Sequence, residues 1–391
     1  MESGTKYPLV FVHGMFGWGA DEGINSKLPY WGATTGDLIQ YLNENGYEAY
    51  STSSGPVSSA WDRACEIYAR LTGTKVDYGK AHSERMHHRR YGRDYSEPLF
   101  EGWGEEKKIH LIGHSHGGNT VRILAHLLTY GSEEERACTP EDELSGLFTG
   151  GKEGWVKTVT TICTPHNGAS AYQFAKKYKI LEPLKAFAFN YIGAVGRSRA
   201  EGGFVDFHLE QYGLSDTPGM QDAYPIRRAK KMLNTYGDNV ETDLAPEGAV
   251  QNNEHIEISP NIYYFSFAYT NVVRMKHLPT RYRAKLSDFP FLTLTSDAIL
   301  IYEHFITPGY KKTYLEIAND GLVNLKSALY PEDEPHREFD RTNLKPGVWN
   351  VMPVRSGDHG TPIGLFADAQ QTRDFYHMLI EILKEVEGEE Q

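Results

Sequence analysis

Lys108-Ile109-His110-Leu111-Ile112-Gly113-His114-Ser115-His116-Gly117-Gly118 is the stretch that decides the fold. Its first half is an apolar run typical of a buried strand. Gly113, Ser115 and Gly117 then form Gly-x-Ser-x-Gly, and Asn119 to Tyr130 repeats apolar residues at helical spacing. A serine between a strand and a helix is the context of a nucleophile elbow, whose tight turn exposes the hydroxyl. A Cβ at either glycine would collide with neighbouring backbone in such a turn, which explains the pattern.

Strands and helices alternate on both sides of this stretch. The sequence predicts strands over Tyr7–Val12, Tyr47–Thr52, Val156–Cys163, Asn261–Thr270 and Val348–Val354, and helices over Asp37–Asn45, Ala60–Thr72 and Asp368–Glu385. Such alternation predicts a parallel sheet covered by helices on both faces. The fold class is therefore α/β, with a mostly parallel central sheet flanked by helices.

A segment of different character interrupts the alternation. Between Ala171 and Val195, apolar residues recur at the spacing of an amphipathic helix, and the aromatic-rich segment Phe204–Leu214 follows. We interpret 169–251 as an insertion, a lid or cap over the carboxyl edge of the sheet, within a single domain over 1–391. A periodic apolar stripe is also what a plain core helix shows, so a core position remains the alternative.

The composition limits the function classes. Hydrophobic residues make up 40% and charged residues 24% of the 391 residues, as in an ordinary globular protein. The formal net charge, 40 − 52 = −12, argues against nucleic acid as a partner. No apolar run is long enough for a transmembrane segment, and no signal segment precedes the first strand. The three cysteines cannot build a disulfide framework.

A serine nucleophile at Ser115 needs a histidine base, and the base needs an acid that fixes its tautomer. In elbow enzymes the acid and then the histidine follow the serine along the chain. Of sixteen histidines, His359 lies in a glycine-flanked loop after a late strand. Asp320 is the best acid because it lies in a tight polar turn at the end of a predicted strand; Asp297 and Asp340 are the rivals.

Two backbone N–H groups are candidates for an oxyanion hole. The residue after an elbow serine supplies one, which here is His116. The glycine-rich stretch His13–Gly19 follows the first strand and leaves N–H groups available to a ligand, so we assign the other to Met15.

These residues resemble a known family, the bacterial true lipases of the thermophilic Bacillus/Geobacillus and staphylococcal group, called family I.5. The matching motifs extend over nearly the whole chain: His13-Gly14-x-x-Gly17-Trp18-Gly19, Tyr30-Trp31-Gly32, Ala60-Trp61-Asp62-Arg63-Ala64-Cys65-Glu66, Val76-Asp77-Tyr78-Gly79-x-Ala81-His82, His114-Ser115-x-Gly117-Gly118, Thr164-Pro165-His166-x-Gly168, Asn319-Asp320-Gly321, Lys345-x-Gly347-Val348-Trp349-Asn350 and Asp358-His359.

The resemblance implies an α/β-hydrolase fold, hydrolysis of carboxylic esters, a helical lid and one structural zinc ion. The family's zinc ligands correspond to Asp62, His82, His88 and Asp243, with His87 as a near neighbour. Two oxygen and two nitrogen ligands suit a closed tetrahedral zinc site. His82 and His88 would lie on different faces of a continuous helix, so the zinc-binding loop over 76–95 must be irregular.

Two departures from the family pattern matter. The acidic residue that contributes to a calcium site after the catalytic histidine is replaced by Gly360-Thr361-Pro362, and the later Asp-Pro ligands are absent near Gly364-Leu365-Phe366. Calcium binding is therefore not expected. His116 stands where the thermophilic lipases carry glutamine, and its side chain could alter the acyl pocket or the pH profile.

The sequence therefore predicts a lipase-like carboxylester hydrolase that acts on hydrophobic esters at a lipid–water or polymer surface, polymeric esters included. A non-catalytic lipid-binding protein on the same fold, or an amidase or acyltransferase with the same triad, is the alternative. The family resemblance suggests a secreted protein, although a cytoplasmic one fits the absence of a signal segment. Protein partners are not indicated.

Overall fold

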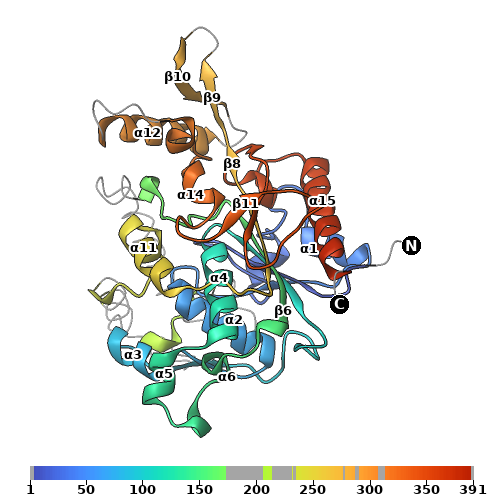
Figure 1. The fold of residues 1–391 in the computed structure, drawn as a ribbon, viewed down its shortest axis with the longest axis vertical. Helices are drawn as coiled ribbons and strands as arrows, with labels where there is room; N and C mark the ends of the chain where they lie inside the picture. Colours follow the sequence, from blue (N-terminus) through green and yellow to red (C-terminus); the bar gives the residue numbers. More distant parts are fainter. Residues whose placement is uncertain are drawn as a thin grey trace.

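A seven-stranded parallel sheet organises the chain (Figure 1). The computed structural model describes residues 4–172, 206–213, 231, 235–275, 278–286, 290–306 and 313–388. The strands of the sheet are ordered β11-β12-β7-β6-β5-β1-β2, and each neighbouring pair is parallel. Their bounds are β1 Leu9–Val12, β2 Ala49–Thr52, β5 Ile109–His114, β6 Val156–Ile162, β7 Tyr263–Phe267, β11 His336–Glu338 and β12 Trp349–Val351.

Helices cover both faces of this sheet. α2 (Ala60–Thr72) and α4 (His116–Tyr130) lie on one face, and α1 (Leu38–Glu44) and α15 (Ala369–Glu387) lie on the other (Figure 1). Successive side chains of a strand point to opposite faces, so β1 contributes Val10 and Val12 to the first core and Leu9 and Phe11 to the second. The predicted fold class is confirmed.

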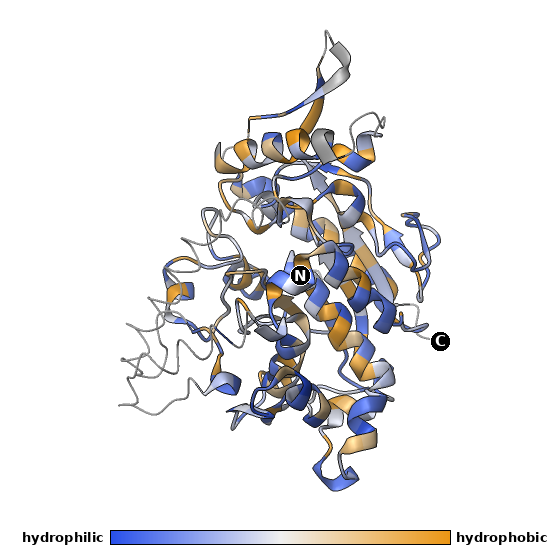
Figure 2. Ribbon diagram, turned by 90° about the vertical axis from the view of Figure 1, so that its left-hand side faces the viewer, coloured by the Kyte–Doolittle hydropathy of each residue, from blue (hydrophilic) through white to orange (hydrophobic). Residues whose placement is uncertain are grey.

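Smaller elements lie around the main sheet. β3 (Lys75–Asp77) pairs antiparallel with β4 (Tyr91–Asp94), and β8 (Tyr269–Thr270) pairs with β13 (Arg355–Ser356). β9 (Val272–Met275) and β10 (Leu278–Ala284) form a hairpin that projects from the rest of the molecule in both views (Figure 1 and Figure 2). The other α-helices are α3 Lys80–Met86, α5 Glu133–Cys138, α6 Gly146–Thr149, α10 Val240–Leu244, α11 Pro246–His255, α12 Pro290–Ile306, α13 Tyr314–Ile317 and α14 Leu325–Leu329.

The structure differs from the expected elements at three places. The strand predicted over Asn261–Thr270 divides into β7 and β8, because β8 leaves the main sheet to pair with β13. The strand expected before Asp320 is the short helix α13, since a short apolar segment fits either period. The sheet also gains the edge strand β11. The proposed lid helix Ala171–Val195 lies outside the described residues, apart from its first two positions.

Candidate active site and candidate metal site

Ser115 lies in the tight turn between β5 and α4, where the strand–serine–helix pattern predicts it. Its backbone is strained, with φ 55° and ψ −128°, although a side chain disfavours positive φ. A Cβ added to Gly113 would lie 2.4 Å from the carbonyl oxygen of Gly117, and one added to Gly117 would lie 2.2 Å from that of Val12. Glycine is therefore required at both positions. Ser115 is partly exposed while the residues on either side of it are buried.

Asp320 and His359 form a buried acid–base pair. Asp320 Oδ2 lies 2.8 Å from His359 Nδ1, and the His359 N–H donates to the Asp320 carbonyl at 2.8 Å. The other carboxylate oxygen accepts the N–H groups of Leu322 and Val323 at 3.0 and 2.8 Å. A carboxylate at Nδ1 holds the proton there, so Nε2 is the basic nitrogen. Gly321, with φ 103°, permits the tight turn that aims the carboxylate.

The two rival aspartates lie elsewhere. Asp297 is on α12, where its carboxylate accepts the Ala284 N–H at 2.9 Å. Asp340 is exposed and accepts the N–H and hydroxyl of Thr342. Neither carboxylate is bonded to His359, so the geometry favours Asp320 as the acid.

His114 connects the elbow to the acid–base pair. Its Nε2 lies 2.9 Å from the His359 carbonyl oxygen, and the two rings are 4.8 Å apart. Its Nδ1 lies 2.7 Å from the Tyr30 hydroxyl, which also accepts the Gly14 N–H at 2.9 Å. Burial, and then the neighbouring His359, keep the pKa of His114 well below its ordinary value. A neutral His114 therefore holds the histidine loop, the elbow and the glycine-rich loop in one arrangement.

The two candidate oxyanion donors belong to loops that contact each other. A Cβ on Gly14 would lie 2.8 Å from Ser115 Cβ, so the loop of Met15 packs directly against the nucleophile. Among the hydrogen bonds of the described residues, none uses the Met15 N–H. His116 is the first residue of α4, and an N–H at that position has no partner within its helix. Both donors therefore remain available.

A second buried group combines two carboxylates with two imidazoles. Asp62, His82, His88 and Asp238 bring one ligand atom each within 4.8 Å of the others. His82 Nε2 lies 3.3 Å from Asp62 Oδ1, and His88 Nε2 lies 3.0 Å from Asp238 Oδ2. Asp62 is in the first turn of α2, His82 is in α3, and Asp238 precedes α10. The group could hold a metal ion that ties these elements together.

The donor chemistry of this group fits a cation. Asp62 Oδ1, Asp238 Oδ1 and His88 Nε2 are buried atoms without a hydrogen-bond partner among the described residues. Burial, and then the charge of Asp238, raise the pKa of Asp62, so two carboxylates at this place need positive charge beside them. Burial opposes protonation of His82, but the two carboxylates outweigh it and raise its pKa to about 9.

Neighbouring side chains orient the four candidate ligands. Gln211 Nε2 donates to the second oxygen of Asp62 at 2.9 Å, and the Tyr212 hydroxyl lies 3.3 Å from Asp238 Oδ2. His88 Nδ1 lies 2.8 Å from the carbonyl of Arg89, which leaves Nε2 to face the group. The predicted irregularity of the loop is confirmed, because α3 ends at Met86 and His87 adopts a left-handed conformation.

The structure corrects the fourth member of the group: it is Asp238, whereas the family resemblance suggested Asp243. Asn239 caps α10 by accepting two helix N–H groups, so Asp238 lies before the helix and turns towards the imidazoles. Asp243 lies inside α10 and faces the other way, where it accepts the Ala60 N–H at 2.7 Å and contacts His116 Nε2 at 2.9 Å. His87 packs its ring against Tyr236 and is outside the group.

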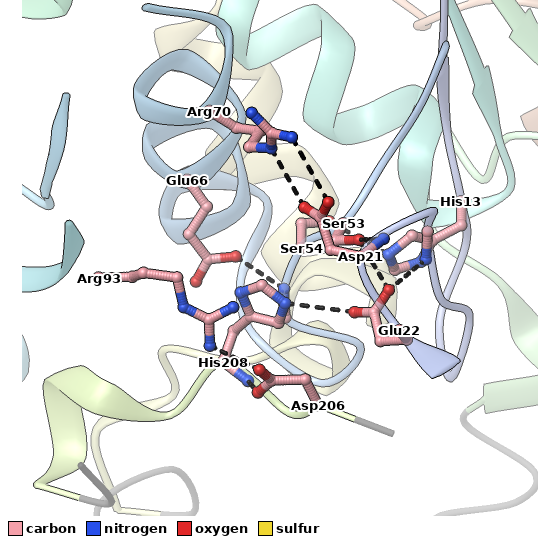
Figure 3. Close-up of polar contacts among 12 residues, drawn as sticks. His13, Asp21, Glu22, Ser53, Ser54, Glu66, Arg70, Arg93, Asp206 and His208 are labelled. Atoms are coloured by element: carbon pink, nitrogen blue, oxygen red, sulfur yellow. Dashed lines mark hydrogen bonds and ion pairs between the residues drawn. The ribbon is translucent and has the colours of Figure 1, made fainter. Parts of the chain in front are cut away.

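Residues 206–213 lie within the predicted insertion, and ion pairs attach this segment to the core (Figure 3). Arg93 contacts Asp206 at 2.6 Å and also pairs with Glu210, and His208 Nε2 lies 3.3 Å from Glu22. Burial and the neighbouring Arg93 oppose protonation of His208, but the surrounding carboxylates outweigh them and raise its pKa to about 9. Buried charges thus hold residues 206–213 to the body of the protein beside the candidate metal group.

Several functional contacts escaped the sequence analysis. Three side chains contact residues of the site, or residues that support it, that are distant in the sequence: Tyr30, Arg63 and His208. Asp238 could have been found from its place just before the Asn239 cap. The side chain of His116 is fully buried, and its ring contacts Arg63 and Asp243. These contacts do not by themselves support the expected influence of this side chain on the acyl pocket.

Comparison with known proteins identifies the family and the fold of the chain. Residues 5–391 match the family model described as "Lipase-like, C-terminal domain". The chain is 34% identical over 389 residues to a lipase of Staphylococcus epidermidis, a match that covers 97% of this chain and 54% of that protein. The crystal structure of Staphylococcus hyicus lipase superposes with a TM-score of 0.84 at 32% identity, covering 100% of this chain and 98% of that one.

A third similar protein is EstA from Clostridium botulinum, with a TM-score of 0.80 and 34% identity over 98% of this chain and 88% of that one. The chain spans about half the length of the staphylococcal sequences it matches. Within the described part of the chain, every helix is too short or too polar to cross a bilayer.

Proposed function

The chain belongs to the family of lipase-like, C-terminal domains, and on that premise we propose that it hydrolyses carboxylic esters with Ser115 as the nucleophile. The observation that carries the proposal is the buried hydrogen bond of 2.8 Å between Asp320 and His359, a pair that His114 connects to the serine of a strained elbow. A non-catalytic lipid-binding protein has no need of an aimed carboxylate, a fixed histidine tautomer and a strained serine together.

The proposed reaction follows from these groups. His359 Nε2 takes the proton of the Ser115 hydroxyl as the oxygen attacks the ester carbonyl. The N–H groups of Met15 and His116 stabilise the negative oxygen that forms. His359 then gives the proton to the leaving alcohol, and a water activated by the same histidine releases the acid. Asp320 orients the ring and stabilises its charged form throughout.

We further propose hydrophobic esters as the substrate class, with the insertion over 169–251 as a cover of the carboxyl edge of the sheet. The substrate class is supported by the lipases among the similar proteins. The cover is supported by the ion pairs that attach residues 206–213 to Arg93 and Glu22. Location outside the cell remains a prediction from the family resemblance.

The test compares wild type with Ser115→Ala on dissolved short-chain, emulsified long-chain and polymeric esters. We expect the variant to lose activity by about 1,000-fold or more at an unchanged melting temperature, since only the covalent step is removed. Ser26→Ala, at an exposed site, is the matched control and should behave as wild type. A Ser115→Ala variant within about tenfold of wild type would end the elbow assignment. An anilide in parallel distinguishes an amidase.

We propose that the metal group of Asp62, His82, His88 and Asp238 holds one structural zinc ion. The support is its donor set, two carboxylate oxygens and two imidazole nitrogens, which suits tetrahedral zinc. Four protein ligands leave no open position for a catalytic water, so the ion would stabilise the joined elements only. The expected lack of calcium near Thr361 stays a prediction.

A further inference from the structure

Arg63 is a fully buried arginine in the first turn of α2. Its guanidinium donates to Ser54 Oγ at 3.0 Å, to His116 Nδ1 at 2.7 Å and to the His13 carbonyl, and one of its nitrogens also lies 3.4 Å from His13 Nδ1. Among the described residues, no carboxylate lies within ion-pair distance of it. A buried charge without an ionic partner is costly for stability, so the presence of Arg63 here needs an explanation. Its uncharged acceptors flank the proposed oxyanion hole.

The contacts with Ser54 and His13 lead to the Met15 N–H. Arginine nitrogens only donate, so Ser54 Oγ accepts from Arg63 and its own proton can go to His13 Nε2, 3.4 Å away (His13 and Ser54 in Figure 3). His13 Nδ1 then carries a proton and donates to the Gly14 carbonyl at 2.8 Å. That carbonyl and the Met15 N–H belong to one planar trans peptide, so fixing the oxygen fixes the opposite direction of the N–H.

The remaining contact leads to the other donor. Arg63 donates to His116 Nδ1, so the proton of that neutral ring is on Nε2 and is donated to Asp243 at 2.9 Å. Asp243 is itself held by the Ala60 N–H at 2.7 Å and by Asn252 at 2.8 Å. The His116 side chain is therefore fixed at both ring nitrogens, which holds the first residue of α4 and its N–H in place.

We propose that Arg63 is a positioning residue of the oxyanion hole: one buried guanidinium orients the Met15 peptide through Ser54 and His13, and the His116 N–H through the His116 ring. The inference rests on the proposed ester hydrolysis. It explains why this buried charge contacts only uncharged acceptors, since each acceptor belongs to, or leads to, one of the two donor loops. When these donors are misoriented, they lose more of their stabilisation of the transition state than of their binding of the substrate.

The experiment measures kcat and KM on a dissolved p-nitrophenyl ester, and the inhibition constant of a trifluoromethyl ketone whose tetrahedral adduct places an oxyanion in the hole. The variants are Arg63→Lys, which keeps the charge but loses the planar fork, and Ser54→Ala, which interrupts only the route to Met15. We expect Arg63→Lys to lower kcat by roughly 10- to 100-fold with KM within about threefold. The inhibition constant should rise by the same factor.

The double variant Arg63→Lys/Ser54→Ala should be no slower than Arg63→Lys, because Arg63→Lys already interrupts the route through Ser54. Arg122→Lys is the matched control: Arg122 is also buried and lies on the helix of His116, but it contacts Asn253 and Glu334. It should change the melting temperature without changing ketone affinity. If Arg63→Lys does not fold, Ser54→Ala decides alone, with an expected kcat loss of about three- to tenfold.

The inference would be overturned by variants with a lower melting temperature whose kcat and ketone affinity stay within about twofold of wild type. Additive losses of kcat in the double variant would also overturn it. A wild type that hydrolyses none of the esters would overturn the proposed function itself, and the oxyanion role with it. An active wild type with unaffected variants would overturn the role of Arg63 only.

Discussion

The acid–base pair and the metal group are both buried, and both place imidazoles against carboxylates, yet they are built in opposite ways. At Asp320, His359 and two backbone N–H groups occupy both carboxylate oxygens. In the metal group, Asp62 and Asp238 each keep a buried oxygen without a hydrogen-bond donor among the described residues. The first site is complete as folded, whereas the second has acceptors that a bound cation would satisfy.

This difference teaches where each site obtains its geometry. The turn Asn319-Asp320-Gly321 is fixed by local hydrogen bonds and by Ser296 of α12, whose hydroxyl lies 2.8 Å from Asn319. The metal group instead joins elements that are far apart in the chain, and two like charges oppose their approach. We therefore expect changes at Asp320 to affect catalysis with little loss of stability, and changes in the metal group to do the reverse.

The largest expected effect is that of Asp320→Asn. An amide in place of the carboxylate no longer fixes the tautomer of His359, so kcat should fall by about 1,000- to 10,000-fold. The melting temperature should change by a few degrees only. Steady-state kinetics and calorimetry on the same samples provide both measurements.

Asp297→Asn is the matched control, since Asp297 is a partly buried aspartate of the neighbouring helix α12 that does not contact His359. It should remain active within about threefold. The reverse result, a crippled Asp297→Asn beside an active Asp320→Asn, would show that the acid is misassigned.

Much of the active site can be predicted from the sequence because its signals are local. The elbow is a five-residue pattern with a strand before it and a helix after it, and Asp320 and His359 lie in short polar loops in the expected chain order. Asp238 was not among the predicted metal ligands: its one local signal is its place just before the Asn239 cap, and the direction of α10 after that cap decides that Asp238 and not Asp243 faces the imidazoles.

Contacts between distant segments explain the other failures. The contacts of Tyr30, Arg63 and Glu22 could not be predicted, because each acts on a partner that only the folded chain brings near. The predicted strand before Asp320 is the helix α13, because four residues are too few to display a period.

A smaller effect is expected on removing the metal. Chelation should lower the melting temperature by roughly 5–10 °C, since an ion that binds only the folded chain contributes a few kcal/mol. Elemental analysis should find about one zinc per chain. Asp238→Ala should lose the ion and resemble the chelated wild type, while remaining active at low temperature.

Asp243→Ala is the informative comparison for that experiment. It should retain zinc, because Asp243 contacts His116 and Ala60 and lies outside the metal group. Zinc lost from Asp243→Ala and kept by Asp238→Ala would restore the assignment made from sequence and reject the one made from structure.

The smallest effect concerns the contacts of His208. Like the metal group they contain several buried charges, but like the acid–base pair their oppositely charged groups are already paired. The folded-state pKa of His208 is raised to about 9, against an ordinary value of 6.5. Its contribution to stability is therefore fully present below pH 6.5 and is lost as the pH rises through about 9. The loss should be on the order of 2 kcal/mol, measured as the free energy of unfolding in urea between pH 7.5 and 9.5.

Zinc-loaded protein is used for this last measurement, so that the ligand histidines do not titrate, and the window lies above the pKa of Glu66, which burial raises to about 7. His208→Gln should be less stable than wild type at pH 7.5 and should lose most of the decline with pH, because no proton is left to release. His336→Gln, at an exposed site, should keep the slope of wild type. An equal slope in His208→Gln would mean that the insertion is held by its hydrogen bonds alone and that buried charge adds nothing to its attachment.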